Sequence, residues 1–593
     1  MATSMLGSRT LQIVVVLAAY LAMAALIDNA YYQLILTSVP IWAVLAIAWN
    51  IFSGYTGLLS FGHAAFFGVG AFTVTLLSTM LDVSPWMGIP LAGAAGATSA
   101  WLIGLVTFRL RGHYFALAMV AYPFALLYLF NWLGFQEVSL PRKVDNGAAY
   151  MQFQNPSTYT ALAVALLFVS LMVASYVDRS RFGLILRAIK QDEAAAQASG
   201  IDPRRWKMRA FVLSGVLAAM AGGLYVVVLN ITTPNEVFGL LVSSNPIVLT
   251  LFGGIGSLWG PVIGALALVP LSEVLHAELG SVLPGIQGVI YGLAILLITM
   301  WLPEGVYWKW VDGRPRGSRL SEQAVDAIAP AGLTRAGANA YAGATEQPSA
   351  RTAVLSVQGV SCVFGSLRAV SGVSFDIEAG SITGVVGPNG AGKTTLFNML
   401  NGFSPTTEGI FRLDGVDITG RPTFARARSG IARTFQTART FPRLSVHDNV
   451  FLGAISVIDD EASARGATAW AVALCGMQDV ADKPAGSLTA GHVRLLEIAR
   501  AIASGPKLLL LDETLAGLSS EEVERVLDVI RAIRRAGITV LIIEHTMSAM
   551  LKLVDRMIVL DRGDLIADEA PGTVIRQPRV IEAYLGKKWA NRA

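Results

Sequence analysis

The sequence SITGVVGPNGAGKTT, at residues 381–395, joins a short apolar run to a glycine-rich loop that ends in Lys-Thr-Thr. The apolar run predicts a buried strand, and Leu396–Asn401 after the loop predicts a helix. Glycines let the N–H groups of such a loop turn toward phosphates, and the helix N-terminus adds partial positive charge. The order strand, loop, helix therefore predicts a phosphate-binding loop, in which Lys393 contacts the β- and γ-phosphates and the Thr394 hydroxyl ligates Mg²⁺.

Two further apolar runs end in residues that suit the same chemistry. Lys507–Leu511 leads into Asp512 and Glu513, and Ile538–Ile543 leads through an acid into His545. An acid at the end of a buried strand beside the phosphate loop suits the water shell of Mg²⁺, and the next acid can polarise the attacking water. The histidine at the third strand end can contact the γ-phosphate. The pattern predicts an α/β domain that binds ATP.

The amino-terminal half has a different character. Of the 593 residues, 54% are hydrophobic and 15% are charged, against about 25% charged in an ordinary soluble chain. This excludes a disordered or wholly soluble protein. The clear apolar runs are Leu11–Ile27, Leu34–Phe52, Leu58–Leu81, Trp86–Phe108, Tyr114–Phe135, Tyr159–Val177, Met208–Leu229 and Leu283–Trp301. Most reach the ~20 residues that cross a bilayer as a helix.

One more apolar stretch, Asn245–His276, is too long for a single span and is interrupted by Gly253–Gly256. We interpret it as two helices, which gives about ten spans. The stretch 311–350 is rich in Ala, Gly, Pro and Ser and predicts a flexible linker. The expected domains are therefore residues 1–310 in the membrane, the linker 311–350, and residues 351–593 as the nucleotide-binding domain.

Charge and cysteine content exclude other classes. The net charge of +4 is too close to neutral to indicate nucleic-acid binding, and 2 Cys cannot build a disulfide framework or a cysteine metal site. Basic residues concentrate between Arg179 and Arg209, which places that loop in the cytoplasm. Helix parity then places the loops Gly134–Thr158 and Asn230–Ser244 outside, where Arg142 and Lys143 are a mild exception. Within the basic loop, Leu184–Ser199 predicts a helix that stops at Gly200 and Asp202-Pro203.

With these elements in place, the motifs resemble a known family. GPNGAGKTT, Gln436, LTAGHVRLLEIARAI, LLLLDE and His545 occur in the order of an ABC-transporter ATPase, over Val354–Gly586. LEIARA, AGL and VIEAYLG resemble the branched-chain amino-acid ATPases in particular. GYTGLLSFGHAAFFGVGA, RLRGHYFALA, LRAIKQDEAAAQASGID, LFGGIGSLWGP and WLPEGV resemble the permease of the same family. The chain thus resembles a permease–ATPase fusion: an α-helical polytopic transmembrane domain followed by an α/β P-loop ABC ATPase domain.

The resemblance implies a role for each motif residue. The implied catalytic residues are Glu513, His545 and Gln436. The implied ATP-binding residues are Phe364, Gly387, Pro388, Asn389, Gly390, Ala391, Gly392, Lys393, Thr394 and Thr395. The implied signature consists of Leu488, Thr489, Ala490, Gly491 and His492. Thr394, Gln436 and, through water, Asp512 would hold Mg²⁺. Arg187, Asp192, Glu193 and Gly200 would belong to a coupling helix that sits in a groove of the ATPase, to which Phe435, Phe441 and Leu444 supply apolar surface.

The family also implies a function and partners. It implies ATP-driven import of a branched-chain or other amino acid, or a related amide or organic acid, across the bacterial inner membrane, with the ATPase domain in the cytoplasm. A periplasmic binding protein would deliver the solute, and a second ATPase and a second permease would complete the assembly as a heteromer or, alternatively, a homodimer. Aromatic or other carboxylates and urea are alternative solutes. An exporter and an ATP-gated regulator are the alternatives from other classes.

Several positions depart from the family pattern. The signature reads LTAGH instead of LSGGQ or LSYGQ, Thr514 replaces the usual proline, and Ser519 ends the following loop. The external stretch GFQEVSLPRKVDNGA replaces an expected Thr/Gly-rich one, which leaves the solute open. Polar residues of the spans are candidates for the solute path, with hydrogen bonding between helices as the alternative. These residues are Asn50, Ser60, His63, Tyr122 and Ser214.

Overall fold

The computed structural model describes residues 2–110, 113–143, 145–279, 286–301, 305–311 and 353–585. Apart from Val311, the linker predicted over 311–350 lies outside the described residues. The chain divides into two compact units. The first comprises Met1–Lys190 and Arg204–Arg316, and the second comprises Gln191–Pro203 and Gly317–Ala593. A short piece of the amino-terminal half therefore belongs to the carboxy-terminal unit.

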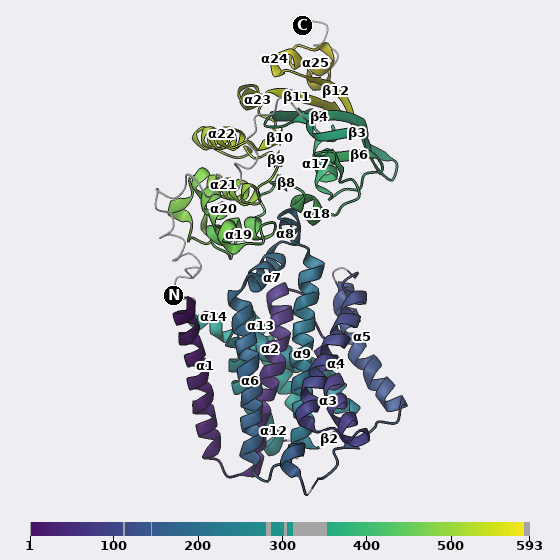
Figure 1. Ribbon diagram of the computed structural model, residues 1–593, viewed down its shortest axis with the longest axis vertical. Coiled ribbons are helices and arrows are strands. Elements are labelled where there is room, and N and C mark those ends of the chain that lie inside the picture. Colours follow the sequence, from purple (N-terminus) through teal and green to yellow (C-terminus); the bar gives the residue numbers. More distant parts are fainter. Residues whose placement is uncertain are drawn as a thin grey trace. The chain divides into compact units, whose positions relative to one another are not determined.

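The first unit is a bundle of apolar helices (Figure 1). Its helices are α1 (Ala2–Ala25), α2 (Ala30–Trp49), the π-helix η1 (Asn50–Gly54), α3 (His63–Met80), α4 (Pro85–Thr107), α5 (His113–Trp132), the 3₁₀-helix η2 (Gly147–Tyr150), α6 (Pro156–Arg179), α7 (Arg181–Gln191), α9 (Pro203–Leu229), α10 (Pro234–Phe238), α11 (Leu240–Gly253), α12 (Gly260–Leu279), α13 (Ile286–Trp301) and α14 (Val306–Val311). Within the described residues, eight segments are long and apolar enough to cross a membrane. Together with the apolar part of α1 and with α13, they match the ten expected spans.

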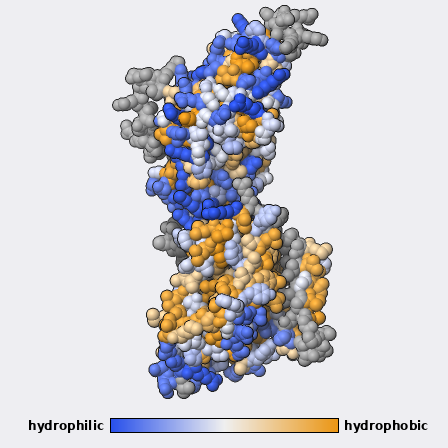
Figure 2. Space-filling model, turned by 90° about the vertical axis from the view of Figure 1, so that its right-hand side faces the viewer, coloured by the Kyte–Doolittle hydropathy of each residue, from blue (hydrophilic) through white to orange (hydrophobic). Residues whose placement is uncertain are grey.

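The surface of this unit fits a lipid environment. On the face that it shows, Figure 2 has a broad band of hydrophobic surface over the helices, with hydrophilic residues gathered at one end. Large exposed apolar residues of the helices include Leu102, Trp101, Tyr128 and Trp132. Large apolar side chains are costly in water and stable in hydrocarbon, so the band supports the membrane interpretation of the helices.

The break predicted within Asn245–His276 is confirmed, since α11 ends at Gly253 and α12 begins at Gly260. Asn50, at the start of η1, makes two hydrogen bonds to the main chain of the loop that connects α11 to α12. Its Nδ2 donates to the Ser257 carbonyl oxygen at 2.8 Å, and its Oδ1 accepts from the Gly256 N–H at 2.8 Å. These two bonds, one buried and one partly buried, agree with the hydrogen-bonding alternative for Asn50.

Three of the other four polar residues of the spans, Ser60, His63 and Ser214, have hydrogen-bond partners close by in the chain. Ser60 Oγ lies 3.0 Å from His63 Nδ1, and Ser214 Oγ donates to the Phe211 carbonyl oxygen at 2.9 Å. Tyr122 is half-buried among the helices. Ser60, His63 and Ser214 are fully buried. These contacts join residues three positions apart in the chain, so they are local and do not connect different helices.

The two loops that helix parity places outside lie at the same end of the bundle. Strand β1 (Val138–Ser139) of the first loop pairs antiparallel with β2 (Ile231–Thr232) of the second. Lys143, one of the two basic exceptions, pairs through Nζ with Asp82 Oδ1 at 2.7 Å. The basic charge of this loop is thus partly compensated by a neighbouring acid.

The second unit is an α/β domain with two sheets. The six-stranded sheet has the order β12-β11-β5-β10-β9-β8, and the four-stranded antiparallel sheet has the order β4-β3-β6-β7. The strands are β3 (Ala353–Phe364), β4 (Leu367–Glu378), β5 (Ile382–Val386), β6 (Glu408–Leu413), β7 (Val416–Asp417), β8 (Ile431–Arg433), β9 (Leu508–Asp512), β10 (Thr539–Ile543), β11 (Arg556–Asp561) and β12 (Asp564–Glu569). Strands β5, β9 and β10 are buried along their whole length, as their apolar runs predict.

Helices pack around these sheets (Figure 1). They are α8 (Glu193–Ala198), α17 (Lys393–Asn401), α18 (Thr423–Arg428), α19 (Val446–Ile455), α20 (Glu461–Leu474), η3 (Gln478–Val480), η4 (Ala485–Ser487), α21 (Ala490–Ala503), α22 (Ser520–Arg535), α23 (Met547–Leu553), α24 (Pro571–Val574) and α25 (Pro578–Leu585). Both cysteines, Cys362 and Cys475, are free and buried in this unit.

The single helix predicted over Leu184–Ser199 is wrong, because the structure has two helices, α7 and α8. Asp192 between them is extended (φ −152°, ψ 106°), and its side chain accepts a hydrogen bond from the Ala195 N–H at 2.8 Å. An aspartate that caps a helix N-terminus in this way favours a new start over continuation. The predicted stop is confirmed, since Gly200 has a left-handed φ of +90°.

Candidate active site

The phosphate loop, Gly387–Thr395, connects β5 to α17. Gly392, which precedes the helix, has φ +99°. A Cβ at this position would lie 2.4 Å from the Ala369 carbonyl oxygen, so both the backbone and the available space require glycine. The sequence therefore folds here into the strand–loop–helix unit that its motif predicts.

Lys393 is the first residue of α17 and is buried. Its Nζ donates to the carbonyl oxygens of Gly387 at 2.7 Å and Pro388 at 2.9 Å, which holds the ammonium over the loop. Burial lowers the pKa of Lys393, while the carboxylates of Glu513 and Asp512 act in the opposite direction. The neighbouring Thr394 is exposed, so its hydroxyl is accessible from solvent.

The three residues predicted to be catalytic lie together, because Gln436 and His545 both contact Glu513. Gln436 Nε2 donates to Glu513 Oε2 at 2.9 Å, and His545 Nε2 lies 2.8 Å from Glu513 Oε1. Glu513 follows β9, Gln436 follows β8, and His545 follows β10, and these strands are neighbours in the parallel sheet. Side chains at the carboxyl ends of parallel strands meet at one edge, so residues distant in sequence converge.

The backbone of Glu513 is itself unusual. Its φ is +48°, which is uncommon for a residue other than glycine, and its N–H donates to the Ile543 carbonyl oxygen at 2.9 Å. Strained backbone of this kind persists only where the surroundings impose it. The geometry therefore fixes the direction of the carboxylate rather than leaving it free.

Asp512 has a chemical environment that suits Mg²⁺. Its side chain is fully buried, its Oδ2 accepts from Arg433 Nη2 at 2.7 Å, and its Oδ1 has no hydrogen-bond partner. Burial raises the pKa of Asp512, and the Arg433 guanidinium acts against this. Together with Thr394 and Gln436, it offers the oxygen donors that Mg²⁺ prefers.

These donors do not form a metal cage by themselves. Within the described part of the chain, no group of three or more His, Cys, Asp or Glu side chains could hold a metal ion. Mg²⁺ that is shared with nucleotide phosphates keeps several waters and needs one or two carboxylates from the protein. The orphaned Asp512 Oδ1 therefore fits Mg²⁺ that arrives with a nucleotide.

The signature, Leu488–His492, starts helix α21. Thr489 is the N-cap, and its Oγ1 lies 2.8 Å from His492 Nδ1. Thr489 and Ala490 are exposed. Among the described residues, no hydrogen bond joins the signature to the phosphate loop of the same chain. The structure thus leaves these two groups separate.

The remaining ATP-binding candidate and the departures from the motif have clear positions. Phe364 ends β3 and is 47% exposed, so its ring is available for stacking. Thr514, in place of the usual proline, is buried, with its Oγ1 3.3 Å from Thr434 Oγ1. Ser519 caps α22 and forms a reciprocal capping box with Glu522. The last two departures therefore serve local structure.

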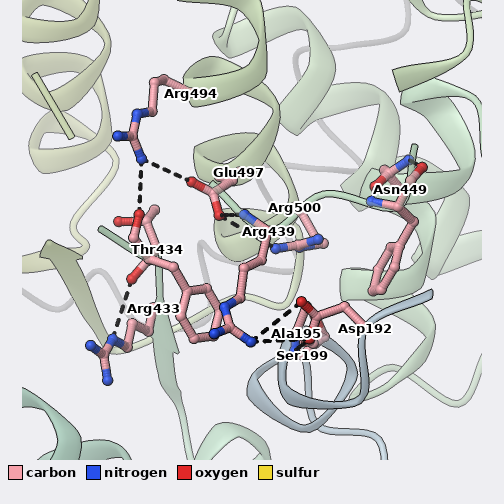
Figure 3. Close-up of polar contacts among 12 residues, drawn as sticks. Asp192, Ala195, Ser199, Arg433, Thr434, Arg439, Asn449, Arg494, Glu497 and Arg500 are labelled. Atoms are coloured by element: carbon pink, nitrogen blue, oxygen red, sulfur yellow. Dashed lines mark hydrogen bonds and ion pairs between the residues drawn. The ribbon is translucent and has the colours of Figure 1, made fainter. Parts of the chain in front are cut away.

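The segment Gln191–Pro203, called the docked segment below, contacts the ATPase unit to which it belongs. Arg439 Nη1 lies 3.4 Å from both carboxylate oxygens of Asp192 (Figure 3). The Arg443 N–H donates to Gln191 Oε1 at 2.9 Å, and Arg428 Nε donates to the Gly200 carbonyl oxygen at 2.9 Å. The contacts lie on both sides of α8, and Glu193 is in the first turn of this helix.

The residues expected to form the groove and the coupling helix have the following positions. Phe435, Phe441 and Leu444 are buried within the unit that contains the docked segment, and the Arg439 guanidinium that faces Asp192 lies 5.1 Å from the Phe435 ring centroid. Arg187, predicted to belong to the coupling helix, lies in the first unit and pairs with Asp178 Oδ1 at 3.3 Å. The helix break at Asp192 explains this separation.

Several charged residues around the site belong to no motif that predicts a role for them. Glu544 is buried, and its Oε1 accepts from the Leu515 N–H at 2.7 Å, which holds the loop after Glu513. Arg433 pairs with Asp512. Arg494 pairs with Glu497 and donates to the main-chain carbonyl oxygen of Gln436. In the sequence, the charged residues within the otherwise apolar segment LLEIARAI were the available indication that charged groups lie near the site.

Comparisons with known proteins agree with this geometry. Residues 31–299 match the family model of the permease component of the branched-chain amino acid transport system, and residues 370–516 match the ABC transporter model. The high-affinity branched-chain amino acid transport ATP-binding protein BraF of Pseudomonas aeruginosa is 36% identical over 250 residues, which are 40% of this chain and 98% of BraF. The corresponding protein LivG of Escherichia coli K12 is 36% identical over 252 residues, covering 40% and 98%.

A solved ATP-binding cassette of an ABC transporter, in its ADP conformation, is 30% identical, covers 40% of this chain and 100% of its own, and gives a TM-score of 0.37. The relatives named above are matched over nearly their whole length, and the permease model matches most of the helical unit. The ABC domain binds ATP, and the hydrolysis of ATP by this domain is coupled to transport. The chain therefore belongs to the branched-chain amino acid ABC transporter family, with a permease domain and an ABC ATPase domain in one polypeptide.

Proposed function

We propose that this chain is the permease–ATPase subunit of an importer in a bacterial inner membrane, with its ATPase domain in the cytoplasm. The docked segment is the observation that carries the proposal. It joins α7 to α9 in the chain, yet it packs within the ATPase unit through Asp192 and Gly200. A permease loop that is part of the ATPase provides a direct mechanical link between ATP hydrolysis and the spans.

The chemistry follows from the residues at the sheet edge. Lys393 and the loop N–H groups hold the phosphates of ATP, and Phe364 stacks on the base. Glu513 polarises the attacking water and accepts its proton, while His545 and Gln436 orient the carboxylate and the water. This assignment is supported by the contacts of both residues with Glu513.

Mg²⁺ would be held by Thr394, Gln436 and, through water, Asp512. When bound with ATP, it neutralises charge on the phosphate oxygens. Asp512 Oδ1 is buried without a partner and can accept a hydrogen bond from a metal-bound water. Arg433 keeps Oδ2 in place, so the free oxygen has a fixed direction.

The transported solute is an amino acid under this proposal, supported by the names of the relatives and of the permease model. A periplasmic binding protein would deliver it. Other carboxylates and urea remain the alternative solutes. An exporter is disfavoured because the loops between spans are short, and an ATP-gated regulator is disfavoured because Lys393, Asp512, Glu513 and His545 are all present.

A single chain does not complete an ATP site. An ABC site combines the phosphate loop of one ATPase with the signature of another, and the two groups lie apart here. The proposed assembly therefore contains a second ATPase and a second permease, with a heteromer favoured and a homodimer as the alternative. A measured mass of about 63 kDa for the active complex, the mass of one chain, would contradict this.

The test is uptake into proteoliposomes that contain the assembled complex and its binding protein. We expect labelled leucine to accumulate only with ATP, and Lys393→Ala to abolish accumulation. The same vesicles tested with labelled benzoate and urea distinguish the alternative solutes. ATP-dependent efflux, or ATP hydrolysis without movement of any of the solutes, would overturn the importer proposal.

A further inference from the structure

Glu497 is a buried carboxylate on α21, the helix that begins at the signature. Its side chain has no exposed surface. The Arg439 N–H donates to its Oε1 at 2.7 Å, Arg494 Nη1 lies 3.6 Å from its Oε2, and Arg500 Nη2 lies 3.9 Å from its Oε1. A buried carboxylate is unfavourable unless it is paired and hydrogen-bonded. The Arg439 N–H and the guanidinium groups of Arg494 and Arg500 therefore offset part of the cost of burying this carboxylate, while Oε2 accepts no hydrogen bond.

One side of the cluster leads to the catalytic carboxylate. Arg494 donates through Nη1 to the Phe435 carbonyl oxygen at 2.9 Å and through Nη2 to that of Gln436 at 2.8 Å. The Gln436 side chain in turn donates to Glu513. Arg494 is thus held by Glu497 on one side and holds the main chain of Gln436 on the other (Figure 3 shows the Arg494–Glu497 pair).

The other side of the cluster leads to the docked segment. Arg439 meets Glu497 with its main chain and Asp192 with its guanidinium. The same guanidinium lies 5.1 Å from the ring centroid of Phe435, so its direction is fixed from two sides. Figure 3 shows Asp192, Arg439 and Glu497 in sequence, with dashed contacts between them. A continuous set of contacts therefore runs from Asp192 to Gln436.

We propose that Glu497 is a positioning residue that relays the position of the docked segment to Gln436 and to the signature helix. The inference rests on the proposed transport function and extends it. When Asp192 moves, Arg439 moves with it, and the N–H of Arg439 changes its contact with Glu497. Arg494 follows Glu497 and shifts the carbonyl of Gln436. A displacement of the docked segment thus changes the contact between Gln436 and Glu513. Because Glu497 belongs to α21, the same displacement also rotates this helix.

The test is a double-mutant cycle on ATP hydrolysis by the assembled complex. Asp192→Asn keeps an N-cap for α8 and removes the charge that faces Arg439. We expect it to change the hydrolysis rate by about threefold. Glu497→Gln keeps the shape and an acceptor for the Arg439 N–H, but removes the charge that orients Arg494. In the Glu497→Gln background, Asp192→Asn should have less than about half of that effect.

Glu408→Gln is the matched control, because Glu408 pairs with the exposed Arg368 at 3.1 Å outside the cluster. In that background Asp192→Asn should keep its full effect. Thermal unfolding checks folding, and if Glu497→Gln does not fold, Arg494→Lys replaces it in the cycle, since lysine cannot bind both carbonyls. A purely structural role predicts additive effects, which would overturn the relay, as would no effect of Asp192→Asn alone. A wild-type complex that does not hydrolyse ATP would overturn the proposed function as well.

Discussion

The position of Glu513, at the end of strand β9, is set by a few contacts of its side chain and backbone. Its two carboxylate oxygens contact Gln436 and His545, and its backbone is held by the Ile543 carbonyl. Lys393 has a different position, folded over the phosphate loop by carbonyls of Gly387 and Pro388. We propose that the lysine binds phosphate in the ground state and that the glutamate acts on water during the reaction.

The first prediction follows from this difference. Lys393→Ala should weaken ATP binding by about tenfold or more, because a charge-assisted phosphate contact is lost. Glu513→Gln should bind ATP as the wild type does and lose turnover, because an amide cannot accept the proton of the water. Equilibrium binding of a fluorescent ATP analogue and phosphate release measure the two effects. Wild-type hydrolysis by Glu513→Gln in the assembled complex would show that another residue is the base.

Residue spacing was sufficient to predict the phosphate loop, Asp512, Glu513 and His545, because each follows an apolar run that makes a strand. It was not sufficient for Arg433, which contacts Asp512 from 79 positions away. That pair depends on β8 lying beside β9, and a sequence pattern does not give strand order. The contact of Glu497 with Arg439 likewise depends on the fold, although the charged residues of LLEIARAI gave an indication in the sequence.

At the scale of elements, the docked segment shows why a helix prediction failed. Leu184–Ser199 is rich in helix-forming residues, but the Asp192 side chain caps the N-terminus of α8 and leaves its own backbone extended. The break lets the chain leave the helical unit at Lys190 and enter the ATPase unit at Gln191. A local capping preference therefore decided the boundary between units, against the average propensity of the stretch.

The loop between α11 and α12 gives the second prediction. Asn50→Leu removes the acceptor of the Gly256 N–H and the donor to the Ser257 carbonyl, which leaves one partly buried and one buried main-chain group unpaired. We expect a loss of about 2 kcal/mol or more in the free energy of unfolding, seen as a lower midpoint in detergent-solubilised thermal unfolding. Asn235→Leu, at an exposed position of α10, is the control and should change the midpoint little. Equal stability of both variants would mean that Asn50 does not hold the break.

At the scale of the whole molecule, the topology gives the third prediction. The basic loop that contains Arg204 should face the cytoplasm, because basic residues remain on that side during insertion. A cysteine at Arg204 should be inaccessible to an impermeant thiol reagent in intact cells, whereas one at Asn235, in the loop that contains β2, should be labelled. Labelling of the Arg204 position from outside would reverse the orientation.

The fourth prediction concerns the two ATP sites of a heteromer. If the partner ATPase carries the usual LSGGQ signature, the site with this chain's Lys393 and Glu513 receives complete parts. The opposite site receives Thr489, whose hydroxyl already contacts His492, and Ala490 in place of glycine. We expect Glu513→Gln to reduce ATP hydrolysis several-fold more than the equivalent change in the partner. Equal losses would indicate that the altered signature is tolerated without effect.

For the whole transporter, we propose that ATP hydrolysis drives transport through the docked segment. Arg439 faces Asp192 across 3.4 Å, with 44% and 23% of their side chains exposed. Arg439→Glu replaces this attraction by repulsion, while Arg439→Glu combined with Asp192→Asn removes the repulsion and preserves the helix cap. Neither residue belongs to the phosphate loop, so ATP binding should stay unchanged in all variants.

The most direct test is the ratio of solute imported to ATP hydrolysed, measured on the same proteoliposomes. We predict that Arg439→Glu lowers this ratio by about fivefold, in line with the upper end of a partly exposed ion pair, and that adding Asp192→Asn restores most of it. An unchanged ratio in Arg439→Glu, with normal uptake, would contradict the claim that the docked segment couples the ATPase to the spans.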